Sequence, residues 1–190
     1  MERKITGKSL LLLESLIDYY KNNITILNSI IIQKSALSLR ILDWLVTNYS
    51  KKHNILYKLY NKENNDYIIF NIFLDYKNQL KAYSKKLFDP FCRRERILIN
   101  INTFEWYELN DLKYKPLDNE LITTVGQLNF FKWFIENKVL VYAIENIKDI
   151  DDDMNKSLSK NKKNTKRTEL SVCASKSICS YEYNSKFVFD

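Results

Sequence analysis

The sequence predicts an α+β fold: N-terminal helices, a small antiparallel sheet and a pair of helices, followed by a basic disordered tail. Apolar residues recur at helical spacing near the start and again after residue 122, and short β-branched and aromatic runs lie between polar turns in the middle. Between residues 154 and 180 large apolar side chains are almost absent, which is typical of disorder. We therefore predict a globular domain over residues 1–153, a basic disordered tail over 154–180, and a terminal strand or short linear motif over 181–190.

The first predicted helix covers residues 9–21. Leu13 and Leu16 fall on one helical face, and Ser9 is a suitable N-cap. Residues 24–32 are rich in β-branched side chains, which favours a strand and leaves a helix as the alternative.

A second helix and a hairpin follow. The helix begins at Ser35 or Ser38, carries leucines on one face and ends near His53. A polar turn then separates two strand-like runs, so we predict a β-hairpin with a long loop and with strands at 56–60 and 67–74.

The second half of the domain continues with a strand at 97–104, where isoleucines alternate with other residues. Residues 111–120 are predicted to form a surface connection. Thr123 or Thr124 then caps a helix, and another helix covers 139–150. The predicted core comprises Leu13, Leu16, Leu42, Leu45, Ile69, Phe73, Ile99, Leu128, Phe131 and Ile135. An all-helical domain is the rival arrangement.

Composition excludes several classes of site. Two glycines exclude Gly-rich phosphate loops, and a single histidine excludes any site with two imidazoles. The three cysteines lack metal-finger spacing, so we expect no metal, no cofactor and a reducing compartment. Glu14 interrupts the only signal-like apolar run, and no window reaches the roughly 18 apolar residues of a membrane span. A soluble protein without a membrane partner is expected.

The net charge of +7 is concentrated in two basic islands. Residues 77–97 hold seven basic side chains against two acidic ones, and residues 154–180 hold seven against one. The rest of the chain is therefore net acidic. Basic islands on an acidic body indicate a polyanionic partner, with two solvated lysine-rich faces as the plain alternative.

Three segments carry a resemblance to a known family: residues 74–96 (LDYKNQLKAYSKKLFDPFCRRER), 123–133 (TTVGQLNFFKW) and 169–177 (ELSVCASKS). Together they resemble an uncharacterised protein that recurs in nucleocytoplasmic large DNA viruses of the mimivirus and algal-virus type. The likeness runs from residue 37 onward, and residues 178–190 depart from it. It implies a viral protein that is packaged with the genome or works in the viral factory of the host cytoplasm, and it implies no activity.

The first island is predicted to bind phosphates. On a helix, the lysines of residues 77–86 share one face, and the Asp89-Pro90 step ends the helix before Arg93 and Arg94. Guanidinium groups bind phosphate bidentately, so these two arginines suit fixed backbone contacts. The interleaved aromatic residues suit either stacking on bases or packing in the core.

The tail is predicted to add reach and non-specific attraction, and its basic hexamer at 162–167 also fits a nuclear import signal. Both DNA and RNA present the backbone that such charges bind. The residues predicted to contact nucleic acid are Lys77, Lys81, Lys85, Lys86, Arg93, Arg94, Arg96, Lys162, Lys163, Lys166 and Arg167.

Two other functions stay open. The first is a non-enzymatic adaptor of the virion or viral factory, which binds other viral proteins through aromatic residues and the terminal FVFD at 187–190. The second is a metal-dependent nuclease, because Asp66 precedes Asp75 and Lys77 at a predicted strand end. That pattern is short, so no catalytic residue is assigned.

Overall fold

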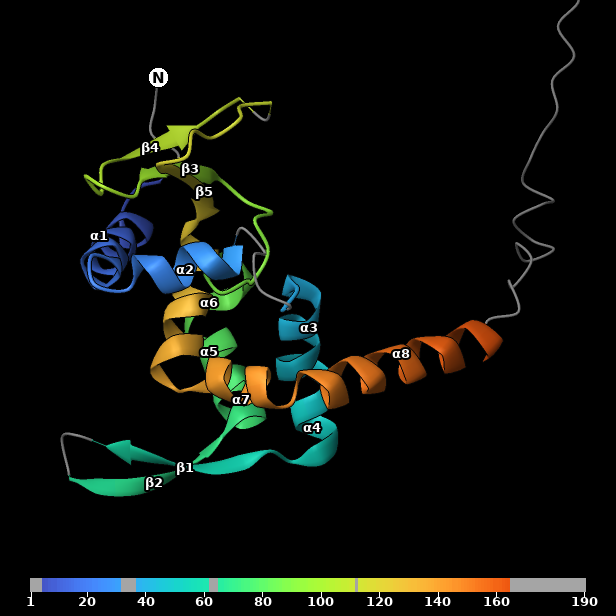
Figure 1. Cartoon of the computed structure of the whole chain (residues 1–190). Coiled ribbons are helices and arrows are strands. Elements are labelled where there is room, and N and C mark those ends of the chain that lie inside the picture. Colours follow the sequence, from blue (N-terminus) through green and yellow to red (C-terminus); the bar gives the residue numbers. More distant parts are fainter. Residues whose placement is uncertain (1–4, 32–36, 62–64, 112, 165–190) are drawn as a thin grey trace, which may run out of the picture. The chain divides into compact units, whose positions relative to one another are not determined.

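The computed structural model describes residues 5–31, 37–61, 65–111 and 113–164 (Figure 1). Its helices and two small antiparallel sheets confirm the predicted α+β class. By its internal contacts the chain divides after Met154, and the elements up to that residue belong to the first unit. In this unit the two sheets lie at opposite ends with helices between them (Figure 1).

The first helix, α1, spans Lys8–Tyr20 and buries the predicted face, with Leu13 and Leu16 fully enclosed. Ser9 is not its N-cap, because the helix already begins at Lys8. Gly7 occupies the cap position with a φ of 56°, in the left-handed region that glycine tolerates.

The strand predicted at 24–32 is wrong, because Ile24–Ile31 forms the helix α2. A β-branched residue loses only about 0.5 kcal/mol in a helix relative to the best helix formers, so modest burial can override its preference. The buried Leu27 of α2 provides such burial, and its N–H donates to the carbonyl of Asn23 at 3.3 Å.

The second predicted helix forms in three consecutive parts: α3 (Leu39–Trp44), the π-helical turn η1 (Leu45–Tyr49) and α4 (Ser50–His53). Ser38 caps it as predicted, because its hydroxyl accepts the N–H of Ile41 at 3.3 Å. The predicted end at His53 is also confirmed, since Asn54 follows in the left-handed conformation. The π-helical turn was not predicted.

The predicted hairpin forms from β1 (Leu56–Asn61) and β2 (Asp66–Asn71). Its second strand is shorter than predicted, because Asn71 accepts the N–H of Leu74 at 2.9 Å and caps the helix α5 (Ile72–Leu87). Alternation along β2 places Phe70 in the core and leaves Ile69 75% exposed. The core assignment of Ile69 is therefore wrong, and Phe73 is only half-buried.

The other sheet has the strand order β4-β3-β5, and both pairs are antiparallel. Its central strand β3 (Arg96–Asn100) confirms the strand predicted near residue 97 but ends earlier, before the turn at Phe104. The strands β4 (Trp106–Leu109) and β5 (Glu120–Thr124) were not predicted. Each is too short to show a clear alternation, so only pairing with β3 defines it.

The core centres on α6 (Val125–Glu136), which contacts α1, α5 and α7. Thr124 caps α6 as predicted, since its hydroxyl oxygen accepts the N–H of Gln127 at 3.1 Å. Ile135 is only half-buried. The predicted core residues that are buried are Leu13, Leu16, Leu42, Leu45, Ile99, Leu128 and Phe131.

The helix predicted at 139–150 is divided at Asn146 into α7 (Val139–Glu145) and α8 (Ile147–Asn164). The prediction of disorder from residue 154 is wrong for residues 154–164, which continue α8. Ile150 and Met154 are both buried one turn apart, so packing anchors the start of this helix. The remainder of the predicted tail, with the terminal segment 181–190, lies outside the described residues.

Among the described residues no helix is both long enough and apolar enough to span a membrane.

Candidate functional site

The first two segments that carry the viral resemblance meet where α6 begins and α5 ends. A Cβ atom on Gly126 would lie 2.8 Å from the carbonyl oxygen of Lys86, so only glycine allows this approach without a shift. The Gly126 carbonyl also accepts the N–H of Asp89 at 3.2 Å. The first turn of α6 therefore fixes the course of the chain just beyond α5.

Two buried amide side chains of α6 complete this attachment. Gln127 Nε2 donates to the carbonyl of Pro90 at 2.8 Å, and Asn129 Nδ2 donates to the carbonyl of Leu87 at 2.9 Å. Thr123 in turn donates its hydroxyl to Gln127 Oε1 at 2.9 Å. The bond from Asn129 satisfies a carbonyl that the end of α5 leaves without a helical partner, and the bond from Gln127 holds the chain at Pro90 just beyond that end. We call Thr123, Gly126, Gln127 and Asn129 the α6 clamp.

The segment held by the α6 clamp forms one wall of a cavity of about 400 Å³. Its other walls come from α3, η1 and α5. Three basic and two acidic side chains line it: Lys85, Arg93, Arg94, Asp43 and Asp89. Sequence positions about fifty residues apart thus converge on one mixed-charge pocket.

Arg93 is held in a fixed orientation at the pocket. Its Nε and Nη2 donate to the two carboxylate oxygens of Asp89 at 3.1 and 3.0 Å, and its guanidinium lies 4.4 Å from the ring centre of Phe91. The hydrogen bond with Asp89 raises the pKa of Arg93. The predicted fixed cation is present, but a carboxylate already offsets part of its charge.

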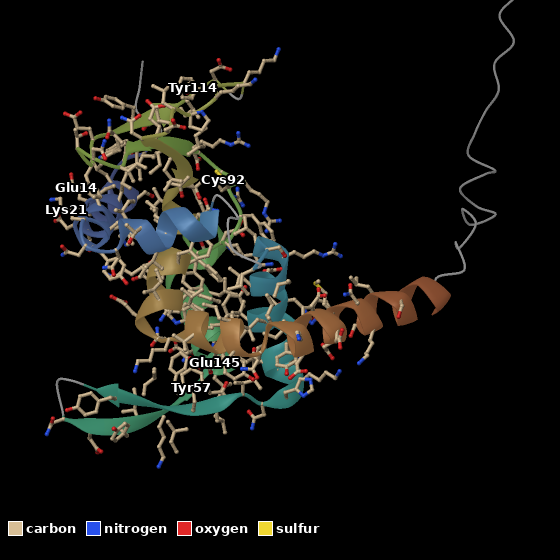
Figure 2. The ribbon with its side chains drawn as sticks, viewed as in Figure 1. Glu14, Lys21, Tyr57, Cys92, Tyr114 and Glu145 are labelled. Carbon is tan, nitrogen blue, oxygen red and sulfur yellow. The ribbon has the colours of Figure 1, made fainter. Side chains whose placement is uncertain are left out.

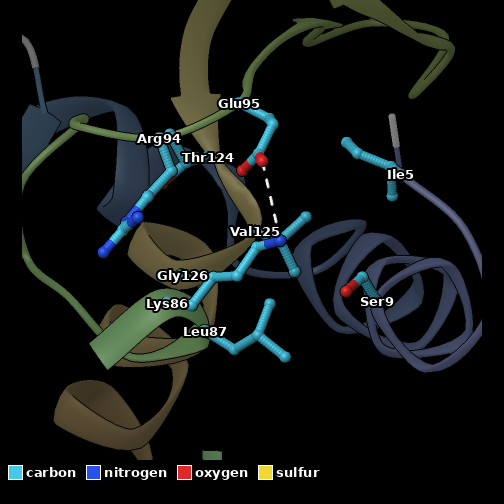
Figure 3. A pocket seen from close by; sticks show the side chains of 9 residues that line it. All are labelled: Ile5, Ser9, Lys86, Leu87, Arg94, Glu95, Thr124, Val125 and Gly126. Atoms are coloured by element: carbon cyan, nitrogen blue, oxygen red, sulfur yellow. Dashed lines mark ion pairs between the residues drawn. The ribbon is translucent and has the colours of Figure 1, made fainter. Parts of the chain in front are cut away.

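Lys85 and Arg94 are the exposed cations of the pocket that make no ion pair within the described part of the chain. Lys86 differs, because its Nζ lies 3.6 Å from Glu95 Oε1 beside a much smaller pocket (Figure 3). In Figure 3 the Arg94 side chain extends away from this pair. Arg94 and Lys85 therefore have their charges available for an anionic ligand.

Asp43 contributes a half-buried carboxylate to the same pocket. Burial raises the pKa of Asp43, and the nearby Asp89 raises it further, whereas Arg93 and Lys85 lower it. The carboxylate makes no hydrogen bond and no ion pair with any described residue. The backbone here is fixed, since the Thr47 hydroxyl of η1 donates to the Asp43 carbonyl at 2.6 Å.

The single lysine stripe predicted along residues 77–86 is wrong. Ser84, with φ 58° and ψ 168°, interrupts the helical geometry of α5 between Lys81 and Lys85. Lys77 and Lys81 are exposed on the regular part of α5, whereas Lys85 lies beyond the break and lines the pocket.

The remaining basic candidates are Arg96 and the four residues of the predicted tail. Arg96 is half-buried at the start of β3. It lies near Cys92, labelled in Figure 2, where burial raises the pKa of the thiol. Lys162 and Lys163 belong to the helical range of α8, and Lys166 and Arg167 lie outside the described residues.

The aromatic residues of the first island divide between core and surface. Tyr76 and Phe88 are buried, so for these two the core interpretation holds. Tyr83 and Phe91 are half-buried, and Phe91 lies under the Arg93 guanidinium.

The strand-end context predicted for a nuclease is wrong. Asp75 lies in the first turn of α5, where its carboxylate accepts the indole N–H of Trp133. Asp66 opens β2 and accepts the N–H of Tyr67 at 2.6 Å. Across the described ranges, no three His, Cys, Asp or Glu side chains come together as a metal site.

Sequence reasoning missed Asp43 and the α6 clamp. The segment 123–133 carried a signal for the clamp, because an Asn and a Gln fall among apolar helix positions. Asp43 carried none, since its charged neighbours in the pocket come from residues 85–94.

The comparisons with known proteins agree with the viral resemblance. Residues 4–187 match a family of unknown function, DUF7197, so the chain belongs to this family. One relative is the uncharacterized protein L507 of Acanthamoeba polyphaga mimivirus, which is 38% identical over 136 residues. The match covers 72% of this chain and 48% of that relative, so the chain spans about half the relative's length. No solved structure matches the chain.

Proposed function

We propose that the protein binds the phosphate backbone of nucleic acid, with Lys85, Arg93 and Arg94 as the centre of the interface. The observation that carries this proposal is the convergence of these three cations on one cavity. Arg93 and Arg94 come from the connection between α5 and β3, and Lys85 comes from α5.

The physical support is preorganisation. The α6 clamp holds the backbone of the connection and Asp89 holds the Arg93 side chain, so these two parts lose little conformational entropy when a phosphate binds there. Charge-assisted hydrogen bonds from guanidinium and ammonium groups are the stronger hydrogen bonds in proteins. Lys77, Lys81 and Arg96 add a longer-range attraction that weakens with salt.

Such an interface suits a protein associated with a viral genome, in the virion or in the viral factory of the host cytoplasm. The mimivirus relative and the net charge of +7 support that setting. The tail residues Lys162, Lys163, Lys166 and Arg167 are proposed to raise the rate of encounter.

A paired-variant experiment tests the proposal. Lys85→Ala with Arg94→Ala removes two pocket charges, and Lys77→Ala with Lys81→Ala removes two charges from the exposed part of α5. Fluorescence anisotropy with labelled oligonucleotides should show that the first pair weakens binding by on the order of 1–3 kcal/mol. The second pair should weaken binding less, because these two lysines contribute only a long-range attraction that salt screens. Equal losses from the two pairs would contradict a pocket-centred interface.

A second candidate function, a protein–protein adaptor, rests on the outer face of the hairpin. Leu56, Tyr60, Tyr67 and Ile69 are exposed on this face, and exposed apolar groups of this kind mark interaction surfaces. Nucleic-acid affinity that does not fall as salt rises would favour this candidate. The adaptor is also favoured if Ile69→Lys abolishes binding to a partner protein and leaves the affinity for nucleic acid unchanged.

A further inference from the structure

Asp43 lies in the wall of the mixed-charge pocket, and its carboxylate makes no hydrogen bond or ion pair with a described residue. A site for a phosphate alone would be weakened by a nearby carboxylate, because the two groups have the same sign of charge. A carboxylate accepts hydrogen bonds from a donor. Its place beside two available cations therefore indicates a ligand that carries both a phosphate and a hydrogen-bond donor.

Asp43 is not present in the pocket in order to pair with its cations. Asp89 already accepts hydrogen bonds from Nε and Nη2 of Arg93, and the salt bridges of the described chain include none between Asp43 and Lys85 or Arg94. The Thr47 hydroxyl bonds the Asp43 backbone carbonyl and leaves the carboxylate oxygens open. Within the described residues the Asp43 side chain thus makes no hydrogen bond and no ion pair, and its favourable interactions with Arg93 and Lys85 act at longer range.

The size of the cavity limits the ligand. About 400 Å³ is in the range of small-ligand pockets and accommodates about one nucleotide. In RNA the ribose 2′-hydroxyl is a donor adjacent to the phosphate, and it is the group by which proteins distinguish RNA from DNA.

We propose that the pocket receives one ribonucleotide unit, with its phosphate on Lys85 and Arg94 and its 2′-hydroxyl donating to Asp43. This inference rests on the proposed function and adds to it that RNA is the preferred nucleic acid. Burial raises the pKa of Asp43, in keeping with a partly desolvated carboxylate. Such a carboxylate gains more from a donor than one in bulk water does.

The test compares three single-stranded oligonucleotides of one base sequence: RNA, DNA and 2′-O-methyl RNA. The methylated strand keeps the ribose but lacks the donor hydrogen. The wild-type chain should bind RNA about 5- to 10-fold more tightly than either other strand, the net effect of one ordinary hydrogen bond. Asp43→Ala should remove this preference, and Asp43→Asn should retain part of it because its amide oxygen still accepts.

The outcomes separate this inference from the proposed function. If RNA and DNA bind equally and Asp43→Ala tightens both, Asp43 acts only as a repelling charge and the inference is overturned while backbone binding stands. If neither strand binds, the proposed function fails as well. The 2′-O-methyl strand tests the inference on the wild-type chain, so it does not depend on the folding of either variant.

A competition arm distinguishes the source of the ligand. A ribonucleoside monophosphate that competes only weakly with the RNA strand supports RNA. If the monophosphate binds as tightly as the strand, the ribose contact with Asp43 still holds, but the ligand is a free nucleotide and the proposal of RNA is overturned.

Discussion

At the scale of single residues, Gly126 shows how one missing side chain supports the pocket. Alanine is favoured over glycine in a helix by up to about 1 kcal/mol, but its Cβ would press on the Lys86 carbonyl at 2.8 Å. A contact with a backbone atom at this distance forces the chain to shift. The cost of overpacking therefore outweighs the gain in helix propensity, and the substitution destabilises the fold. We predict that Gly126→Ala lowers the free energy of unfolding by roughly 1–3 kcal/mol, as measured by urea denaturation.

Gly7→Ala is the matched control for Gly126→Ala. No atom lies within 4 Å of a Cβ built at Gly7, so its cost comes only from the positive φ. The control should leave nucleic-acid binding unchanged, whereas Gly126→Ala should also weaken it through Asp89. A stabilised Gly126→Ala variant would contradict the close packing of α5 and α6.

Asp153 is the second residue with a testable role. Its carboxylate is 9% exposed, accepts the Trp44 indole N–H at 3.1 Å and pairs with Lys52. The hydrogen bond from Lys52 lowers the pKa of Asp153 in the folded state. The stabilisation is therefore complete above the unfolded pKa of about 3.9 and is lost as the pH falls through the folded pKa.

We predict that Asp153→Asn lowers the free energy of unfolding at neutral pH by roughly 1–3 kcal/mol, the range for hydrogen bonds to charged groups. Wild type and variant should converge as the pH falls through the folded pKa. Thermal unfolding measured across pH checks this, with the exposed neighbour Asp152→Asn as control. An unchanged gap between wild type and Asp153→Asn in acid would contradict the role of the ion pair.

At the scale of elements, the hairpin offers a direct test of strand register. Ile69 and Phe70 are adjacent, yet Ile69 is 75% exposed and Phe70 is 6% exposed. Phe70→Ala should cost roughly 3–5 kcal/mol of unfolding free energy, the range for a buried aromatic residue. Ile69→Ala should stay within about 0.5 kcal/mol of wild type. A reversed order in urea denaturation would mean that the register is shifted by one residue.

The elements also show which features of the sequence are sufficient to predict a helix or a strand. Two helix starts were limited to Ser35 or Ser38 and to Thr123 or Thr124, and the structure has Ser38 and Thr124 as the caps. A capping side chain acts over only three residues, so its signal is local in the sequence. α2 was mistaken for a strand, since local preference differs little between the two states there and tertiary packing decides. β4 and β5 were missed for a similar reason: hydrogen bonds to β3, distant in sequence, define them.

At the scale of the whole molecule, the two basic islands should divide their work. Changing Lys162, Lys163, Lys166 and Arg167 to glutamine removes four charges and leaves every residue that lines the pocket unchanged. We predict a salt dependence of log affinity that is shallower by up to about 3, since each phosphate contact contributes roughly 0.7–0.9. Binding through the pocket should remain measurable. A filter-binding titration against salt checks this, and complete loss of binding would make the tail the binder.

The sequence by itself determined the α+β class, the first helix face, the viral resemblance and the two concentrations of positive charge, and it limited two helix caps to Ser35 or Ser38 and to Thr123 or Thr124. All of these depend on neighbours within a few turns of helix or on composition. Only the tertiary structure decided that Ile69 is exposed and that the Asp75 carboxylate accepts the indole N–H of Trp133. It also decided that Asp43 lies with Lys85 and Arg94 in one pocket. The physical reason is that these features depend on contacts between segments far apart in the chain, and spacing along the sequence carries no signal for such contacts.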